Sequence, residues 1–202
     1  DVSSNIAAKV ARDYEHFAAH GWPESLEAYL AADCQLDVAT TYGGLTIKNP
    51  FGKASGQLSM TARQVEEDVE AGLGFVVLKT VIAQDETGTQ SMGDWAIKEA
   101  RMVVEPITGR SGETGWTVSW KGRGWWGTFE DYLQLIRDAR QLAAGRETLI
   151  VPSCKYHLPT PEEETWKESE YRYTTAQLLD AWRDGQKDGG PMPREKDFSP
   201  TL

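Results

Sequence analysis

The chain has 202 residues, of which 40% are hydrophobic and 26% are charged, and this length suits one sizeable globular domain. Its formal net charge of -10 argues against a nucleic-acid partner, which would need a basic face. No apolar run approaches the roughly 20 residues that a membrane span needs. With no visible signal peptide and only Cys34 and Cys154 as thiols, the sequence favours a cytoplasmic protein without a disulfide framework.

The first 35 residues are predicted to form a helical extension. Ile6, Val10, Tyr14 and Phe17 recur at helical spacing, which predicts an amphipathic helix over residues 4–20. Pro23 is well placed to open a second helix that reaches residue 32. We expect both helices to lie outside the main domain, which then comprises residues 36–202.

The rest of the chain alternates between strand-like and helix-like segments. A hairpin is expected where residues 36–41 and 45–48 flank Tyr42-Gly43-Gly44. A long insertion over residues 81–127 contains two shorter alternating runs, 101–106 and 116–120. The main strands are predicted at residues 51–55, 75–78, 148–153 and 195–199, and the helices at 61–71, 129–144 and from Thr174 or Thr175 to about 183.

This order predicts an α/β fold with a parallel sheet and right-handed crossovers. Four β/α units cannot close an eight-stranded barrel, which usually takes about 250 residues.

One short pattern points to a family. Residues 44–56 read G-L-x-x-x-N-P-x-x-x-A-S-G, and Lys79-Thr80 follows at the end of the next apolar strand. This pattern resembles the opening of the dihydroorotate dehydrogenase-like flavoenzymes, including the flavin barrel of dihydropyrimidine dehydrogenase. The resemblance covers residues 41–80 well and the later residues only faintly. It implies that the chain is the N-terminal half of a (β/α)8 barrel of the TIM type, completed by another chain or segment, and that the cofactor is FMN.

The resemblance also implies roles for the matching residues. Ala54, Ser55 and Gly56 would line the flavin, and Lys79 would stabilise negative charge on the reduced cofactor beside Thr80. The alternatives are a tight turn without a ligand at residues 54–56 and a lysine that extends from the strand end into solvent.

The loop that contacts substrate in this family has a different sequence here. The corresponding segment contains Ser119, Lys121, Gly122, Arg123 and Trp125 but none of the family's substrate-binding asparagines. These residues are our candidates for substrate binding, and they favour a larger, flatter or anionic substrate. The alternative is that the tryptophans of this loop pack the loop or an interface.

The predicted last strand departs from the family as well. Residues 195–200 align with an E-x-N-x-S-C-P strand, so Asp197 stands where the family has an asparagine near the flavin. Pro200 stands at the position of the catalytic cysteine, and proline cannot act as a general base. The usual proton abstraction is then absent or performed by another residue. The resemblance makes Ser199 a candidate for the catalytic base, because serine serves as the base in membrane-linked relatives of this family.

Other polar residues are weaker candidates for a functional site. Cys154 and His157 have C-x-x-H spacing just after the third strand, but one such pair makes a poor zinc site, so no metal is predicted. Tyr156 or His157 is a candidate acid near the flavin. The glutamates of residues 162–170 are expected to lie in a solvated loop.

These observations predict an FMN-dependent oxidoreductase subunit. It would transfer hydride to or from a C–C bond of a small cyclic or conjugated substrate, and it would act together with a second chain that completes the barrel in a heteromer. Two alternatives remain open. One is a non-catalytic structural or regulatory half-barrel, and the other is a fragment of a single-chain flavoenzyme.

Overall fold

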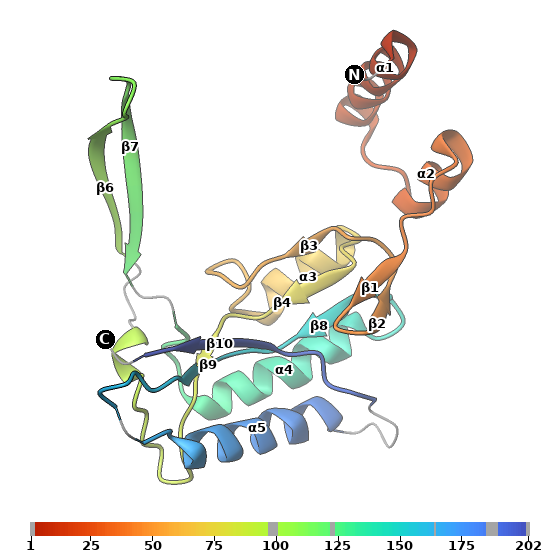
Figure 1. Ribbon diagram of the computed structural model, residues 1–202. Coiled ribbons are helices and arrows are strands. Elements are labelled where there is room, and N and C mark those ends of the chain that lie inside the picture. The colour runs from red at the N-terminus through yellow and green to blue at the C-terminus, as the bar shows by residue number, and fades with distance from the viewer. Residues whose placement is uncertain (1–2, 97–100, 122–123, 164, 185–189, 201–202) are drawn as a thin grey trace.

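The computed structural model describes residues 3–96, 101–121, 124–163, 165–184 and 190–200, with only the backbone at 101, 102 and 119–121. The chain is a mixed α/β protein (Figure 1). Its described helices are α1 (Ser4–His20), α2 (Leu26–Cys34), α3 (Ala62–Glu70), α4 (Phe129–Ala143) and α5 (Glu168–Arg183), with a 3-10 turn η1 at Gly93–Trp95. Its described strands are β1 (Thr40–Tyr42), β2 (Leu45–Ile47), β3 (Gly52–Lys53), β4 (Phe75–Val77), β5 (Val81–Ile82), β6 (Arg101–Thr108), β7 (Thr114–Lys121), β8 (Leu149–Val151), β9 (Ser153–His157) and β10 (Glu195–Ser199).

The centre of the molecule is a parallel arrangement of four chain segments. β4 pairs with β3 on one side and with β8 on the other, while β9 pairs with β5 and β10. Since β5 follows β4 and β9 follows β8 along the chain, the four segments lie side by side in sequence order. Among the described residues these strands do not close into a barrel.

A β-bulge interrupts the second segment. Val77 pairs with Val151 and Val81 pairs with Cys154, so the second segment advances four residues while its neighbour advances three. The extra residue lies between Val77 and Val81, where the Lys79 amide leaves the ladder and donates to the carbonyl of Ser59 at 2.9 Å. Bulges redirect side chains, often next to functional sites.

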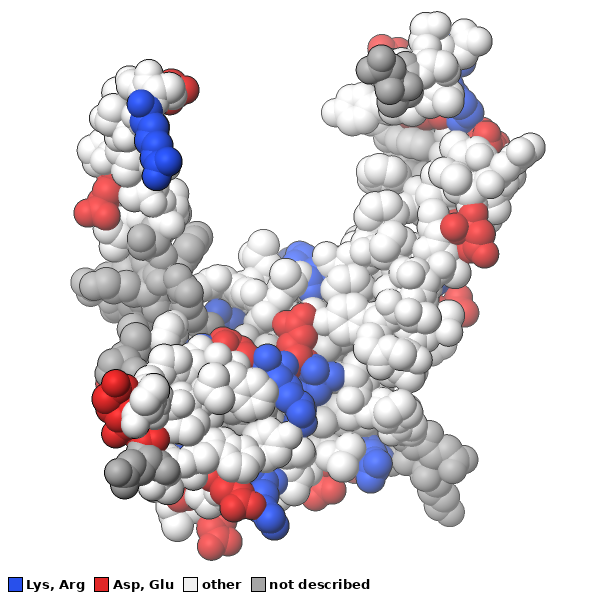
Figure 2. All heavy atoms as spheres, viewed as in Figure 1, with Lys and Arg blue, Asp and Glu red and all other residues white. Residues whose placement is uncertain are grey.

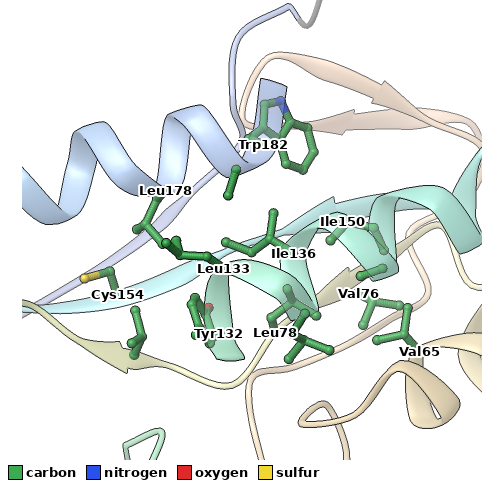
Figure 3. Close-up of a cluster of buried hydrophobic side chains, with 14 of the residues drawn as sticks. Val65, Val76, Leu78, Tyr132, Leu133, Ile136, Ile150, Cys154, Leu178 and Trp182 are labelled. Atoms are coloured by element: carbon green, nitrogen blue, oxygen red, sulfur yellow. The ribbon is translucent and has the colours of Figure 1, made fainter. Parts of the chain in front are cut away.

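Three helices cover one face of these strands. The hydrophobic cluster joins Val65 of α3, Ile136 of α4 and Leu178 of α5 to alternate residues of the strands, among them Val76 and Cys154 (Figure 3). Helices on one face of strands in sequence order are what right-handed crossovers produce. We call the opposite side of the strands the open face.

Local sequence signals explain the helix boundaries. Thr61 and Gln64 form a reciprocal capping box at the start of α3, and Thr128 accepts a hydrogen bond from the Asp131 amide at the start of α4. Gly72, with a φ of 77°, follows α3 and allows the chain to turn into β4. These two predicted helices are confirmed.

The small hairpin β1–β2 lies at the N-terminal ends of the parallel strands. Tyr42 stacks at 4.7 Å on Phe75 and donates a 2.6 Å hydrogen bond to Glu195, which begins β10. Asn49 fastens the hairpin to the turn before β4, since its side-chain oxygen accepts from the amides of Phe51 and Gly74. The asparagine of the N-P pair therefore has a structural task here.

Two projections extend from the same side of this body, as Figures 1 and 2 show. One consists of α1 and α2, and the other is the antiparallel hairpin β6–β7, in which Val104 pairs with Val118 and Pro106 with Trp116. Val104, Trp116 and Val118 are exposed. None of the described helices is both long and apolar enough to cross a bilayer.

Several predicted boundaries were wrong. The third strand continues beyond residue 153 through β9, so residues 154–157 lie in the sheet and not in a loop after it. Helix α5 begins at Glu168, and Thr174 is buried inside it, where its hydroxyl bonds both the amide and the carbonyl of Gln84. Ser25, and not Pro23, marks the start of α2.

The expected solvated loop of glutamates was also partly wrong. Glu170 is buried in the first turn of α5, where its carboxylate accepts hydrogen bonds of 2.8 Å from the amide and the hydroxyl of Ser91. This contact fixes the segment that precedes η1. A buried carboxylate needs such donors, and they come from a segment 79 positions earlier in the chain.

Candidate functional site

The structure brings together the predicted residues at the ends of the first two strand segments. Ser55 and Thr80 lie within 2.9 Å of each other through their hydroxyl oxygens, and Thr80 is 2.9 Å from the hydroxyl of Ser153 on β9. We call Ser55, Thr80 and Ser153 the hydroxyl ladder. Each hydroxyl both donates and accepts, so the ladder also has lone pairs and protons for a further polar group.

The loop after β3 has space beside it. A Cβ atom added to Gly56 would meet only the carbonyl oxygen of Ala54, at the ordinary distance of 3.9 Å, and Gly56 does not have a positive φ. Neither packing nor backbone conformation therefore requires glycine here. At Gly74, by contrast, an added Cβ would lie 2.0 Å from the carbonyl oxygen of Asn49.

Lys79 lies in the bulge next to the hydroxyl ladder. Lys79 is 5% exposed, and no hydrogen bond or ion pair joins its amine to any part of the chain that the structure describes. Burial lowers the pKa of this amine because desolvation penalises the charged form. Val76 and Leu78 point into the helix-covered core, so strand alternation directs Lys79 to the open face.

A second buried lysine lies on the open face at Lys155, in the middle of β9. Its amine donates to Asp197 at 2.6 Å and to Ser199 at 2.8 Å, and Ser199 donates to the other oxygen of Asp197 at 3.2 Å. The amine also lies 4.2 Å from the centre of the Trp95 ring. We call Lys155, Asp197, Ser199 and Trp95 the Lys155 cluster.

The register explains why these residues meet. Asp197 pairs with Lys155 and Ser199 pairs with His157, so the odd-numbered residues of both strands share the open face. Cys154 and Tyr156 point the other way, into the hydrophobic cluster. Burial raises the pKa of the Cys154 thiol to about 12, which makes this thiol inert as a nucleophile.

His157 and Cys154 do not form a joint site, because they lie on opposite faces of β9. His157 is buried, and its Nε2 is 3.2 Å from a carboxylate oxygen of Glu163 without the angle of a hydrogen bond. The predicted C-x-x-H spacing therefore does not bring two ligands together. Tyr156 packs against Tyr171 and Phe198 on the helix-covered side, so it lies on the opposite face of the strands from the hydroxyl ladder.

The predicted substrate loop is only partly described. Ser119 and Lys121 belong to β7, with their side chains outside the described part, and Gly122 and Arg123 lie outside it altogether. The amide of Trp125 donates to the carbonyl of Thr80 at 2.6 Å, and its ring packs edge-on against Tyr132. The structure thus gives Trp125 a packing role, and substrate contact by this ring stays a prediction.

Sequence reasoning missed Lys155 and Trp95. The predicted third strand ended at residue 153, which left Lys155 outside it, yet the alternation of Cys154 and Tyr156 with polar neighbours is the period-two signal of a strand. No comparable signal marks Trp95. It reaches the cluster because the chain between β5 and β6 folds back over the strand ends, where the Gly124 amide donates to the Trp95 carbonyl at 2.8 Å.

No known protein-family model matches this chain, and no curated protein matches it significantly. The resemblance at residues 41–80 therefore rests on short motifs, and a function must be argued from the geometry of the open face.

Proposed function

We propose that this chain is half of an FMN-dependent (β/α)8-barrel oxidoreductase, with the cofactor held on the open face. Two features support the proposal. Four parallel segments in sequence order, with their helices on one face, are the arrangement that consecutive β/α units of a barrel adopt. In such barrels the C-terminal ends of the strands carry the active site, and the hydroxyl ladder, Lys79 and the Lys155 cluster lie toward those ends.

The single observation that carries the proposal is the amine of Lys79, which has no hydrogen-bond or ion-pair partner among the described residues. Burying a charged amine without a partner costs free energy, and a protein retains such a group where a ligand supplies the missing negative charge. A reduced flavin ring is an anion of that kind. Gly56 leaves space beside the same bulge, and the hydroxyl ladder offers hydrogen bonds to polar ring atoms.

The bound FMN would supply hydride transfer to or from a C–C bond of a cyclic or conjugated substrate. The residues of this chain would do the rest. Lys79 would hold the ring by its charge, and Ala54, Ser55, Gly56 and Thr80 would line it. Ser199 would exchange a proton at its hydroxyl oxygen, held between the Lys155 amine and the Asp197 carboxylate.

The proposal includes a partner that completes the barrel, either a second chain or a further segment. The outer strands β3 and β10 each pair on one side only among the described residues, so their other edges offer backbone donors and acceptors. Uncovered edges invite pairing with further strands. Polar groups for the flavin phosphate would come from that partner.

The test separates the flavin ring from its phosphate. Lumiflavin carries the ring alone and FMN carries both, so we would titrate each into isotopically labelled protein and follow backbone amide resonances. The expected result is perturbation by lumiflavin at residues 54–56, 79 and 80, with binding at least ~10-fold weaker in Lys79→Met. No perturbation by either flavin at millimolar concentration would overturn the proposal.

A matched control is available on the other side of the same strands. Lys196→Met removes the same charge, but Lys196 lies on the helix-covered side of β10 and donates to Tyr171. We expect its lumiflavin affinity to equal that of the unaltered protein. Equal losses in both variants would show that net charge, and not the Lys79 position, governs binding.

A further inference from the structure

The Lys155 cluster determines what kind of group a ligand can present at its end of the open face. The ammonium of Lys155 has three protons. Two point to Asp197 and Ser199, and the amine also lies against the face of the Trp95 ring. Lys155 is 4% exposed, so it keeps no donor for an incoming ligand.

Asp197 is the accessible member of the cluster. A carboxylate has about four acceptor positions, and Lys155 and Ser199 occupy one on each oxygen. The side chain of Asp197 is 48% exposed, whereas that of Lys155 is 5% exposed. A ligand that approaches the cluster therefore meets free lone pairs of a carboxylate, with the balancing positive charge buried behind it.

We infer that Asp197, held in place by Lys155, selects ligands that present N–H donors of an amide or amidine type and rejects ligands that present a carboxylate. The reason is chemical. An N–H group makes a charge-assisted hydrogen bond to Asp197, whereas a second carboxylate would face a like charge without a donor between them. This inference rests on the proposed function, because it deepens the account of the substrate for the same face.

The inference narrows the substrate class that the loop sequence suggested. Cationic residues of that loop favoured an anionic substrate, but the group that reaches Asp197 must be a donor. An anionic group on the same substrate would instead have to lie toward Lys79, whose amine has no partner in the described chain. The two ends of the open face thus suit different groups of one ligand. The end near Lys79 suits an anionic group, and the end near Asp197 suits a hydrogen-bond donor.

Three probes of equal size and shape test this inference. Benzamidine, benzamide and benzoate carry on the same ring a cationic donor, a neutral donor and an anionic acceptor. We would measure the dissociation constant of each from the amide resonances of residues 153–157 and 195–199. The expected order of affinity is benzamidine, then benzamide, then benzoate, with at least ~10-fold between the first and last.

Two isosteric variants locate the effect. Asp197→Asn exchanges one acceptor oxygen for a donor and should reduce the ratio of benzamidine to benzoate affinity to about threefold or less. Glu195→Gln removes the same charge two residues earlier on β10, where the carboxylate already accepts from Tyr42, and should leave the ratio unchanged.

The outcomes separate this inference from the proposed function. Benzoate binding as tightly as benzamidine to the unaltered protein, a ratio that persists in Asp197→Asn, or no binding of any probe at tens of millimolar would overturn the inference. The first and third of these outcomes are measured on the unaltered protein, so they decide the inference even if Asp197→Asn does not fold. Discrimination among the probes without any lumiflavin response would leave the inference standing and overturn the flavin proposal alone.

Discussion

The two faces of the parallel strands are built from alternate residues of the same segments, and they differ in their polar groups. On the helix-covered face Val76, Ile150 and Cys154 pack into one hydrophobic cluster. On the open face the neighbouring residues Thr80 and Ser153 contact each other through hydroxyls, and Lys155 with its partners forms a charged network beyond them. The open face also carries the buried apolar residues Val77, Ile82 and Val151, so its distinguishing feature is the polar groups among them. These polar groups indicate a role other than packing.

The largest expected difference between the faces is in stability. Ile136→Ala on α4 should lower the free energy of unfolding by about 2–5 kcal/mol, because it opens a cavity in the cluster. Ser153→Ala on the open face should cost only about 1 kcal/mol, the usual value of one hydrogen bond. Urea unfolding followed by circular dichroism measures both. Equal costs would mean that the open face is packed as tightly as the core.

Two glycines give the next comparison. Gly74→Ala should lower the free energy of unfolding by about 1–3 kcal/mol, because its Cβ collides with the Asn49 carbonyl. Gly56→Ala should change it by less than about 0.5 kcal/mol, because the added atom meets only ordinary contact. Thermal unfolding of the two variants under the same conditions measures both changes in stability. A large loss at Gly56 would show that the space beside it is needed by the protein itself.

Lys79 gives a third comparison between the two faces, because replacing this open-face residue should stabilise the protein. Lys79→Met should raise the free energy of unfolding by about 1 kcal/mol near pH 7, since it replaces a buried amine without a partner by an apolar chain. The folded-state pKa of Lys79 is lowered, so the unfolded chain binds more protons between that pKa and 10.5. The stability contribution of Lys79 therefore rises with pH through this window, and the advantage of the variant should shrink.

Urea unfolding of the unaltered protein and of Lys79→Met at several pH values up to 10 tests whether the stability advantage of the variant shrinks as the pH rises. An advantage of Lys79→Met that stayed constant or grew with pH would show that the amine is not desolvated in the folded chain.

The smallest expected effect concerns the two thiols and leaves stability unchanged. Cys34 is exposed, whereas Cys154 is buried with a pKa raised to about 12. A thiol reagent at pH 8 should therefore modify Cys34 in the native protein and reach Cys154 only on unfolding. Mass spectrometry of tryptic peptides after timed labelling measures both rates. Fast labelling of Cys154 would show that the helix-covered face opens readily.

Much of the fold was predictable because its signals are local. Thr61 and Thr128 mark helix starts through hydrogen bonds within one turn, and Gly72 ends α3 through its own φ. Strand type and parallel order follow from the alternation of segments. Start points that depend on distant partners were wrong, as in α5, whose first turn contains Glu170 bonded to Ser91.

The candidate site, like the fold, could be predicted from the sequence only in part. The family resemblance of short motifs at the predicted strand ends selected Ser55, Lys79, Thr80, Asp197 and Ser199. Only the tertiary structure decided how these residues are connected. The register of β9 against β10 aligned Lys155 with Asp197, and the segment around η1 brought Trp95 over the amine. Which polar groups neutralise one another and which remain for a ligand depends on contacts between segments far apart in the chain, and no local pattern encodes those contacts.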